Sequence, residues 1–155
     1  MAQKAAKSKF TNKFKFLEKA VTADVAFEAY GKNLKEVFAN AALATAETMV
    51  GTDAVTPRMQ KTIRLQNKDV GALLIDFLNE IIYYKDAEQV LLVKFDIDIK
   101  ENKETGVHVL TAKIAGEPID YKKHQLRADV KAATHHMFEL KQHGKTWTAR
   151  VVLDI

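Results

Sequence analysis

The chain has 155 residues, of which 47% are hydrophobic, and this size and composition are typical of one globular domain with its own core. It has no cysteine, which excludes disulfides and thiolate metal sites and fits a reducing compartment. No apolar run approaches the roughly 18 residues of a membrane span, and the amino terminus lacks the apolar core of a secretory signal. We therefore expect a cytoplasmic domain with no membrane contacts.

The positive charge gathers at the amino terminus. The formal net charge is +4, from 24 basic and 20 acidic residues, and five of the lysines fall within residues 1–16, where there is no acid. The rest of the chain then holds 19 basic and 20 acidic residues. We expect residues 1–16 to be a disordered basic tail, with at most weak contacts to RNA, and residues 17–155 to form a single domain.

The first elements alternate between strand and helix. Residues 24–31 alternate apolar and polar side chains up to a glycine, which predicts a strand. Asn33 is a good N-cap for a helix predicted from Asn33 to Val50, where apolar residues recur at helical spacing. Residues 58–66 alternate again and predict a second strand.

The strongest local pattern predicts a helix from Asn67 to Lys85. Apolar residues recur there at helical spacing over three turns, namely Val70, Leu73, Leu74, Phe77, Leu78, Ile81 and Ile82. We interpret this stripe as a core-facing surface rather than as a ligand site. Gly71 lies inside the helical pattern at a cost of about 1 kcal/mol relative to alanine, so we expect another element to pack closely there.

The remainder of the chain predicts four strands in two hairpins. Residues 90–102 and 107–119 are strand-like segments on either side of a turn, and residues 127–142 and 146–155 repeat that arrangement. Strands joined by tight turns are antiparallel. The predicted order is thus β-α-β-α-β-β-β-β, an α+β fold in which two helices pack with largely antiparallel sheets.

Most side chains that often carry chemistry are poorly placed for it. His135 and His136 are neighbours on a predicted strand, so their side chains point to opposite faces and do not share a metal. The other three histidines lie apart from one another, without the spacing of a zinc site. There is no glycine-rich phosphate loop, and the one serine, Ser8, lies in the tail. These residues do not predict an enzyme.

Two aspartates mark the ends of the predicted domain. Asp24 begins the first strand, and Asp154 is followed only by Ile155 and its terminal carboxylate. Carboxylate oxygens suit Mg²⁺, Ca²⁺ or Mn²⁺ rather than zinc or copper. Because any two aspartates offer the same ligands, the residues alone leave open whether they bind a metal or simply contact water.

The segment TADVAFEAYGKNLKEVFANAALATAETM resembles the opening of the archease family. The segments LLIDFLNEIIYYKD, AGEPIDYKKHQLRADVKAATHHMFEL and WTARVVLDI resemble later blocks of that family in the same order. The resemblance runs from about Thr22 to Ile155. The family usually has a histidine where this chain has Val21, and often a tyrosine where it has His135.

The resemblance implies a small protein that is not an enzyme and that assists an RtcB-type tRNA-splicing RNA ligase. Archeases promote guanylylation of that ligase, which loads GMP onto an active-site histidine and permits multiple turnover, and they can broaden its nucleotide choice. The resemblance also implies a divalent metal ion, Ca²⁺ or Mg²⁺/Mn²⁺, bound by Asp24, Asp154 and the terminal carboxylate of Ile155. Asp154 and Ile155 are then expected to face the ligase, and RNA is contacted only through it.

Two other interpretations of the same residues stay open. One is a small divalent-metal-dependent hydrolase in which Asp24 and Asp154 hold the ion, although no general base is evident. The other is an RNA-binding module that uses the lysine-rich tail.

Overall fold

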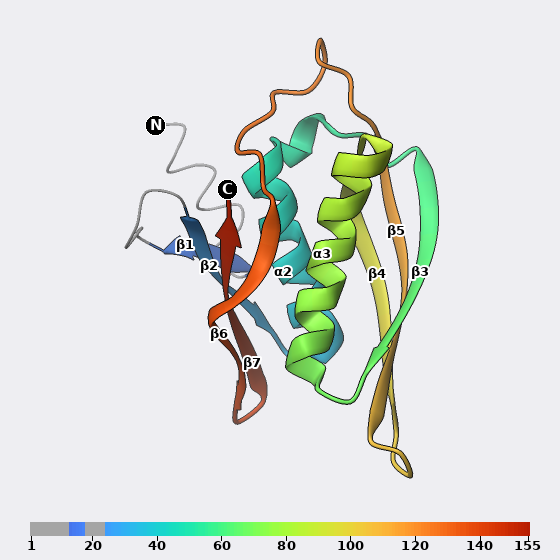
Figure 1. Cartoon of the computed structure of the whole chain (residues 1–155), viewed down its shortest axis with the longest axis vertical. Helices are drawn as coiled ribbons and strands as arrows, with labels where there is room; N and C mark the ends of the chain where they lie inside the picture. Colours follow the sequence, from blue (N-terminus) through green and yellow to red (C-terminus); the bar gives the residue numbers. More distant parts are fainter. Residues whose placement is uncertain (1–12, 18–23) are drawn as a thin grey trace.

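The computed structural model describes residues 13–17 and 24–155, in which two helices lie between two antiparallel sheets (Figure 1). The strands are β1 (Phe14–Leu17), β2 (Asp24–Gly31), β3 (Met59–Asn67), β4 (Val90–Asn102), β5 (Val107–Pro118), β6 (Ala132–His143) and β7 (Thr146–Asp154). The helices are α2 (Leu34–Met49), the short 3-10 turn η1 (Thr52–Ala54) and α3 (Val70–Glu88). None of these described helices is long and apolar enough to cross a membrane.

The strands pair antiparallel in both sheets. The four-stranded sheet has the order β1-β2-β7-β6, and the three-stranded sheet has the order β3-β5-β4. The four-stranded sheet combines the first and last strands of the domain, so it brings segments that are far apart in the sequence side by side (Figure 1). The prediction of an α+β fold with two helices and largely antiparallel sheets is confirmed.

One strand precedes those that the sequence predicted. Residues 14–16, which we assigned to the basic tail, belong to β1 and pair with β2. Phe14 is only 3% exposed and lies opposite Ala29 at the core, while Lys15 is exposed and lies 3.6 Å from the Glu28 carboxylate. This alternation is the pattern of a half-buried edge strand. Residues 1–12 of the predicted tail lie outside the described part of the chain.

The strand β6 begins five residues later than predicted, at Ala132 instead of residue 127. Two of the residues before it direct their backbone N–H groups to α2. Arg127 donates to the carbonyl of Met49 at 2.8 Å, and Ala128 donates to the carbonyl of Thr48 at 3.1 Å. The last carbonyls of a helix have no partner inside the helix. The end of α2, rather than a neighbouring strand, therefore shapes the chain before β6.

The core lies between the two sheets and surrounds α2 and α3. Phe38 of α2 and Phe77 of α3 stack with ring centroids 6.4 Å apart, and Phe77 meets Phe95 of β4 edge-on at 6.3 Å. The apolar stripe predicted for α3 is buried at Leu73, Leu74, Phe77, Leu78, Ile81 and Ile82. The helix α2 contacts both β2 and β4, and its many buried alanines permit this close approach.

Both helices begin where a polar side chain accepts free backbone N–H groups. Asn33 Oδ1 accepts from the N–H of Glu36 at 2.9 Å, and Asp69 Oδ1 accepts from the N–H of Gly71 at 2.8 Å. The close packing expected at Gly71 is also present. A Cβ atom at that position would lie 3.0 Å from the ring of Phe138 in β6.

A tight backbone contact joins β4 to β5 at Gly116. The register between these strands shifts between Leu92 and Lys94. A Cβ atom on Gly116 would lie 1.7 Å from the carbonyl oxygen of Leu91. Because that oxygen belongs to strand backbone, it cannot move aside as a flexible side chain would, and only glycine fits.

The substitution Gly116→Ala should lower the free energy of unfolding by at least about 2 kcal/mol, because β4 must shift to accommodate the new methyl group. Gly51→Ala is the matched control, since its Cβ would meet only the Arg127 side chain at 3.5 Å. The control should change stability by less than about 0.5 kcal/mol. Urea unfolding measures both, and equal stability of the two variants would contradict the tight contact.

Candidate functional site

Asp24 and Asp154 meet at the ends of two neighbouring strands. Asp24 is the first residue of β2, Asp154 is the last residue of β7, and the two are direct partners in the antiparallel register. Directly opposite residues project from the same sheet face, with Cβ atoms about 4.5–5.5 Å apart. The adjacent side chains of Val25 and Leu153 pack in the core, so both carboxylates lie on the outer face of the four-stranded sheet.

We call Asp24, Asp154 and Ile155 the acidic tip. Asp154 is exposed and Asp24 is partly exposed, whereas the side chain of Ile155 packs against the core. That packing places the terminal carboxylate directly after β7. Among the described residues, no three Asp, Glu or His side chains come together as a metal site. A cation at the acidic tip would therefore rely on two side-chain carboxylates and the chain terminus.

Residues 119–131, which we call the crossing segment, lie next to the acidic tip. They connect β5 of one sheet to β6 of the other and pass over the ends of both helices (Figure 1). The last of them, Lys131, donates its backbone N–H to the carbonyl of Asp154 at 2.8 Å. The acidic tip is thus held between β2 on one side and the crossing segment on the other.

Two ion pairs fasten the crossing segment to the helices. Lys85 of α3 donates to the Asp129 carboxylate at 2.8 Å. Burial alone would lower the pKa of Lys85, but its hydrogen bonds to Asp129 and Asp86 outweigh that effect and raise this pKa. Arg127 contacts the Glu47 carboxylate of α2 at 2.7 Å. Both helix ends therefore hold the segment through charged groups.

A third anchor is the carboxylate of Glu117, at the end of β5. Glu117 is 3% exposed and accepts hydrogen bonds from Lys123 Nζ at 2.7 Å, the Thr56 N–H at 2.8 Å, His124 Nε2 at 2.9 Å and Arg58 Nε at 3.0 Å. The bond from Lys123, followed by those from Thr56 and His124, holds the pKa of Glu117 far below its usual range. We call these five residues the Glu117 cluster.

His124 has a defined role in this cluster. Its Nδ1 accepts the backbone N–H of Asp120 at 2.9 Å, so the proton sits on Nε2 and is donated to Glu117. Because both ring nitrogens are used and the side chain is fully buried, His124 is not available to a metal or substrate. The Glu117 cluster therefore supports the crossing segment.

Sequence reasoning did not identify Glu117 or Lys85 as supports of the site. Several of their partners lie far along the chain, namely Thr56 and Arg58 for Glu117 and Asp129 for Lys85. The only local signal was the Gly-Glu-Pro segment followed by Lys122, Lys123 and His124. That segment is informative only through its resemblance to the archease family. A charge that becomes buried through tertiary contacts leaves no periodic pattern.

The histidine pair lies on an irregular part of β6. Its register with β7 shifts between Thr134 and Glu139, and Met137 has a φ of 54° in the left-handed region. His135 and His136 are both exposed in this bulge. The expectation that regular strand alternation separates them assumed a geometry that β6 does not have here.

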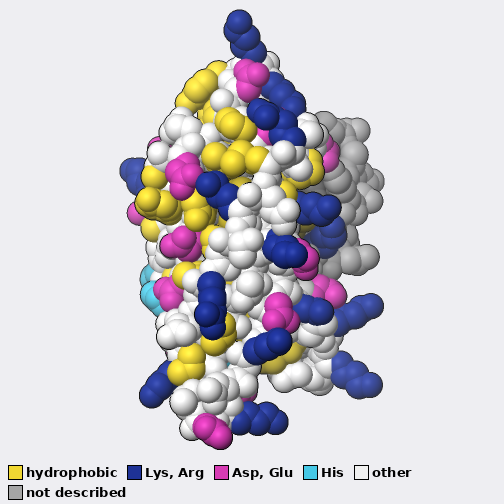
Figure 2. All heavy atoms as spheres, turned by 90° about the vertical axis from the view of Figure 1, so that its right-hand side faces the viewer, with side chains coloured by type: hydrophobic (Ala, Val, Ile, Leu, Met, Phe, Trp, Pro, Cys, Tyr) yellow, Lys and Arg dark blue, Asp and Glu magenta, His cyan; other side chains and the backbone are white. Residues whose placement is uncertain are grey.

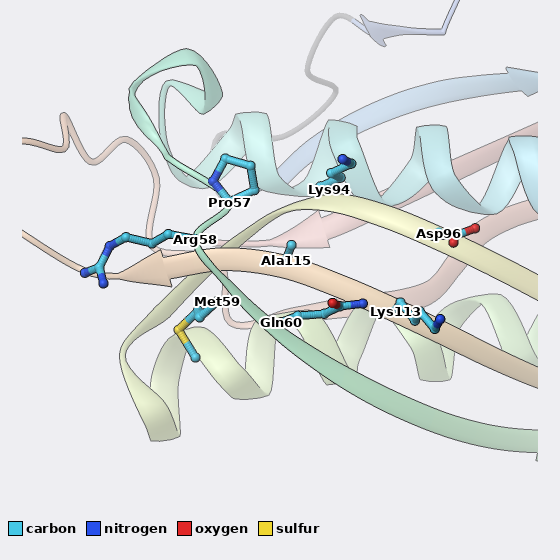
Figure 3. Close-up of a pocket in the computed structure, with 8 residues that line it drawn as sticks. All are labelled: Pro57, Arg58, Met59, Gln60, Lys94, Asp96, Lys113 and Ala115. Atoms are coloured by element: carbon cyan, nitrogen blue, oxygen red, sulfur yellow. The ribbon is translucent and has the colours of Figure 1, made fainter.

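A hollow on the outer face of the three-stranded sheet lies apart from the acidic tip (Figure 3). It has a cavity volume of about 330 Å³ and is lined by exposed polar side chains, among them Arg58, Gln60, Lys94 and Lys113. Basic and acidic side chains are mixed on this side of the molecule (Figure 2). Because the hollow lies on the sheet that lacks both aspartates, it does not belong to the candidate site.

The sequence model of the Archease protein family matches residues 14–155. The chain belongs to the archease family. The protein archease of Methanothermobacter thermautotrophicus is 41% identical over 142 residues, which cover 92% of this chain and 98% of that one. The archease of Sulfurisphaera tokodaii is 36% identical over 143 residues, which cover 92% and 99% of the two chains. The match begins at Phe14, where β1 also begins.

Two solved structures share this archease fold. The solution structure of protein 1598 of Methanobacterium thermoautotrophicum has a TM-score of 0.76 at 35% identity, over 93% of this chain and 99% of that one. The crystal structure of an archease from Thermotoga maritima, described as a possible chaperone, has a TM-score of 0.58 at 18% identity, over 90% and 98% of the chains. The family resemblance inferred from the sequence is thus confirmed, although Val21 lies outside the described residues.

The substitution Glu117→Gln should change how the stability of this archease depends on pH. The folded-state pKa of Glu117 is depressed below its ordinary value of 4.5, so its contribution to stability is present above about pH 4.5. That contribution is lost as the pH falls toward the folded-state pKa. Glutamine does not titrate and leaves Lys123 and Arg58 without their carboxylate, so the variant should be less stable at neutral pH.

The stability difference between the two proteins should therefore narrow once the pH falls below about 4.5. Urea unfolding at a series of pH values measures the difference, with Glu104→Gln in an exposed turn as the control for the substitution itself. A difference that stays constant from neutral pH to about pH 3 would contradict the role assigned to the charge of Glu117.

Proposed function

We propose that this archease is a non-enzymatic activator of an RtcB-type tRNA-splicing RNA ligase. The observation that carries the proposal is the pairing of Asp24 with Asp154 at an accessible strand end beside the chain terminus. Membership of the archease family supports it. The described residues supply no ion pair to either carboxylate, so both are suited to meet a charge that comes from outside the protein.

The acidic tip suits a hard divalent cation such as Ca²⁺, Mg²⁺ or Mn²⁺, because all of its ligands are carboxylate oxygens. Its place on an outer sheet face lets water or a partner protein provide the remaining ligands. A bound cation would supply positive charge for nucleotide phosphates. The contribution of this chain is to hold the two carboxylates opposite each other. The pairing of β2 with β7 and the hydrogen bond from the Lys131 N–H to Asp154 do this.

We propose that the acidic tip acts on the guanylylation step, in which the ligase loads GMP onto its histidine. The ligase must bind an anionic nucleotide again after each ligation, and carboxylates brought to its metal centre can change the coordination there. Because the tip is the end of a paired strand, a docked archease presents it in one orientation. This role places the protein in the cytoplasm with the ligase, and RNA is contacted through the ligase.

The substitution Asp154→Ala should remove most of the stimulation of GMP loading, because it deletes one of the two paired carboxylates. The side chain is exposed, so the free energy of unfolding should change by less than about 1 kcal/mol. Asp98→Ala, which removes an exposed acid on β4, is the matched control and should keep the stimulation. A neutral extension after Ile155 should also impair the stimulation of GMP loading, because it moves the terminal carboxylate. GMP transfer and multiple-turnover ligation measure these effects, and full stimulation by Asp154→Ala would exclude the mechanism.

The metal is tested separately on the isolated protein. Asp24→Asn should weaken the binding of Mn²⁺ or Ca²⁺ by about tenfold or more in calorimetric titrations, because a charged ligand is lost. Asp98→Asn is the control and should bind the ion as the unaltered protein does. An equal loss of ion affinity in both variants would indicate that cations are attracted by the general negative charge of the surface. That result would contradict a site at the acidic tip.

A further inference from the structure

A cavity opens beside the crossing segment, at the end of the molecule that carries the acidic tip. Its volume is about 340 Å³. Its apolar walls come from the end of α2, the start of β4 and the crossing segment, namely Met49, Leu91, Ile119, Tyr121 and Leu126. Its charged walls pair with their neighbours, because Lys85 contacts Asp86 and Asp129, and Arg127 contacts Glu47. The lining is therefore mixed, but its cations are already paired with acids, which leaves the apolar side chains as the groups free to contact a partner.

Two exposed apolar side chains line this cavity. Tyr121 is 73% exposed and Leu126 is 40% exposed, and both belong to the crossing segment. The other exposed large hydrophobic residues of the described chain, Phe16, Tyr83 and Met137, do not line it. Figure 2 shows hydrophobic side chains gathered toward this upper end of the molecule. Exposed apolar groups beside a concave surface are typical of a protein-binding site, and tyrosine often dominates such interfaces.

The backbone that carries these side chains is fixed by contacts inside the protein. Leu126 forms a bridge with Val50, and the next residue, Arg127, donates its N–H to the carbonyl of Met49. The Glu117 cluster holds the stretch between Tyr121 and Leu126. Side chains that are already held in place lose less conformational freedom when a partner binds. The rim of the cavity is therefore prepared for binding without rearrangement.

The acidic tip is too small to bind a protein alone. A specific interface buries about 800 Å² on each partner, which corresponds to a patch of about 16 Å radius. Leu126 is five residues before Lys131, whose N–H contacts Asp154, and five residues span at most about 18 Å, less than the width of about 32 Å of such a patch. An interface of this size can therefore include both the acidic tip and Leu126.

We infer that the rim of this cavity, with Tyr121 and Leu126 as anchors, is the surface that docks the ligase, and that the acidic tip acts within the docked complex. The inference rests on the proposed function and names the surface by which the same partner is held. The occupant is a protein surface with an apolar side chain, because Tyr121 and Leu126 expose apolar surface at the rim while the lining cations Lys85 and Arg127 are paired with acids. Among the described residues that line the cavity, the two basic side chains, Lys85 and Arg127, are both paired with acids, which disfavours a nucleic acid as the occupant.

Binding and stimulation separate docking from activation. The double variant Tyr121→Ala/Leu126→Ala should bind the purified RtcB-type ligase at least about tenfold more weakly. Asp154→Ala should bind within about fivefold of the unaltered protein but should lose stimulation. Tyr83→Ala is the matched control, because Tyr83 is 55% exposed and does not line the cavity. At saturating concentration the double variant should recover full stimulation, since its acidic tip is intact.

Ligase binding by the double variant as tight as that of the unaltered archease would overturn the docking surface and leave the proposed function standing. No ligase binding by the unaltered archease would overturn both. The double variant could instead keep its ligase affinity and lose self-association or binding to an RNA hairpin. That result would assign the surface to a second copy of the chain or to RNA, and it would overturn the inference. If the double variant does not unfold cooperatively on heating, Tyr121→Ala alone provides the same test. Its side chain is largely exposed, so its removal should not disturb the fold.

Discussion

The buried carboxylate of Glu117 is the interaction on which this end of the molecule depends. A buried carboxylate is tolerated only when it is paired and hydrogen-bonded. Its donors come from two separate stretches, since Thr56 and Arg58 precede β3 whereas Lys123 and His124 belong to the crossing segment. One anion thus draws together the loop after α2, the end of β5 and the start of the crossing segment. It fixes the direction in which the chain leaves the three-stranded sheet.

The path of the crossing segment in turn sets the surroundings of the acidic tip. The segment caps α2 as it crosses, because its N–H groups reach the carbonyls of Thr48 and Met49, which the helix itself leaves without partners. The ammonium group of Lys85 holds it to α3. It then arrives beside β7, where Lys131 contacts Asp154. Since its backbone and its charged side chains satisfy internal groups, its exposed side chains Tyr121 and Leu126 can face a partner without loss to the fold.

Local sequence predicted the helices and most strands, because each buries one face at a regular period. It failed where distant contacts decide the structure. The alternation of lysine and phenylalanine around Phe14 was a strand signal, but the charge of the tail concealed it. Residues 127–131 resembled a strand, although Arg127 and Ala128 donate their N–H groups to α2. The pairing of Asp24 with Asp154 is a register between opposite ends of the domain, so only the family resemblance pointed to it.

The residues at the end of β7 are held in place on both sides. The Lys131 N–H donates to the carbonyl of Asp154, and the side chain of Ile155 packs against the core. Aspartate is disfavoured in strands, and like charges directly opposite each other destabilise a sheet. The fold nevertheless places Asp154 directly opposite Asp24 and orders both. A cation or a positively charged partner group would relieve that repulsion, so this pairing is the physical reason for the binding role proposed for the acidic tip.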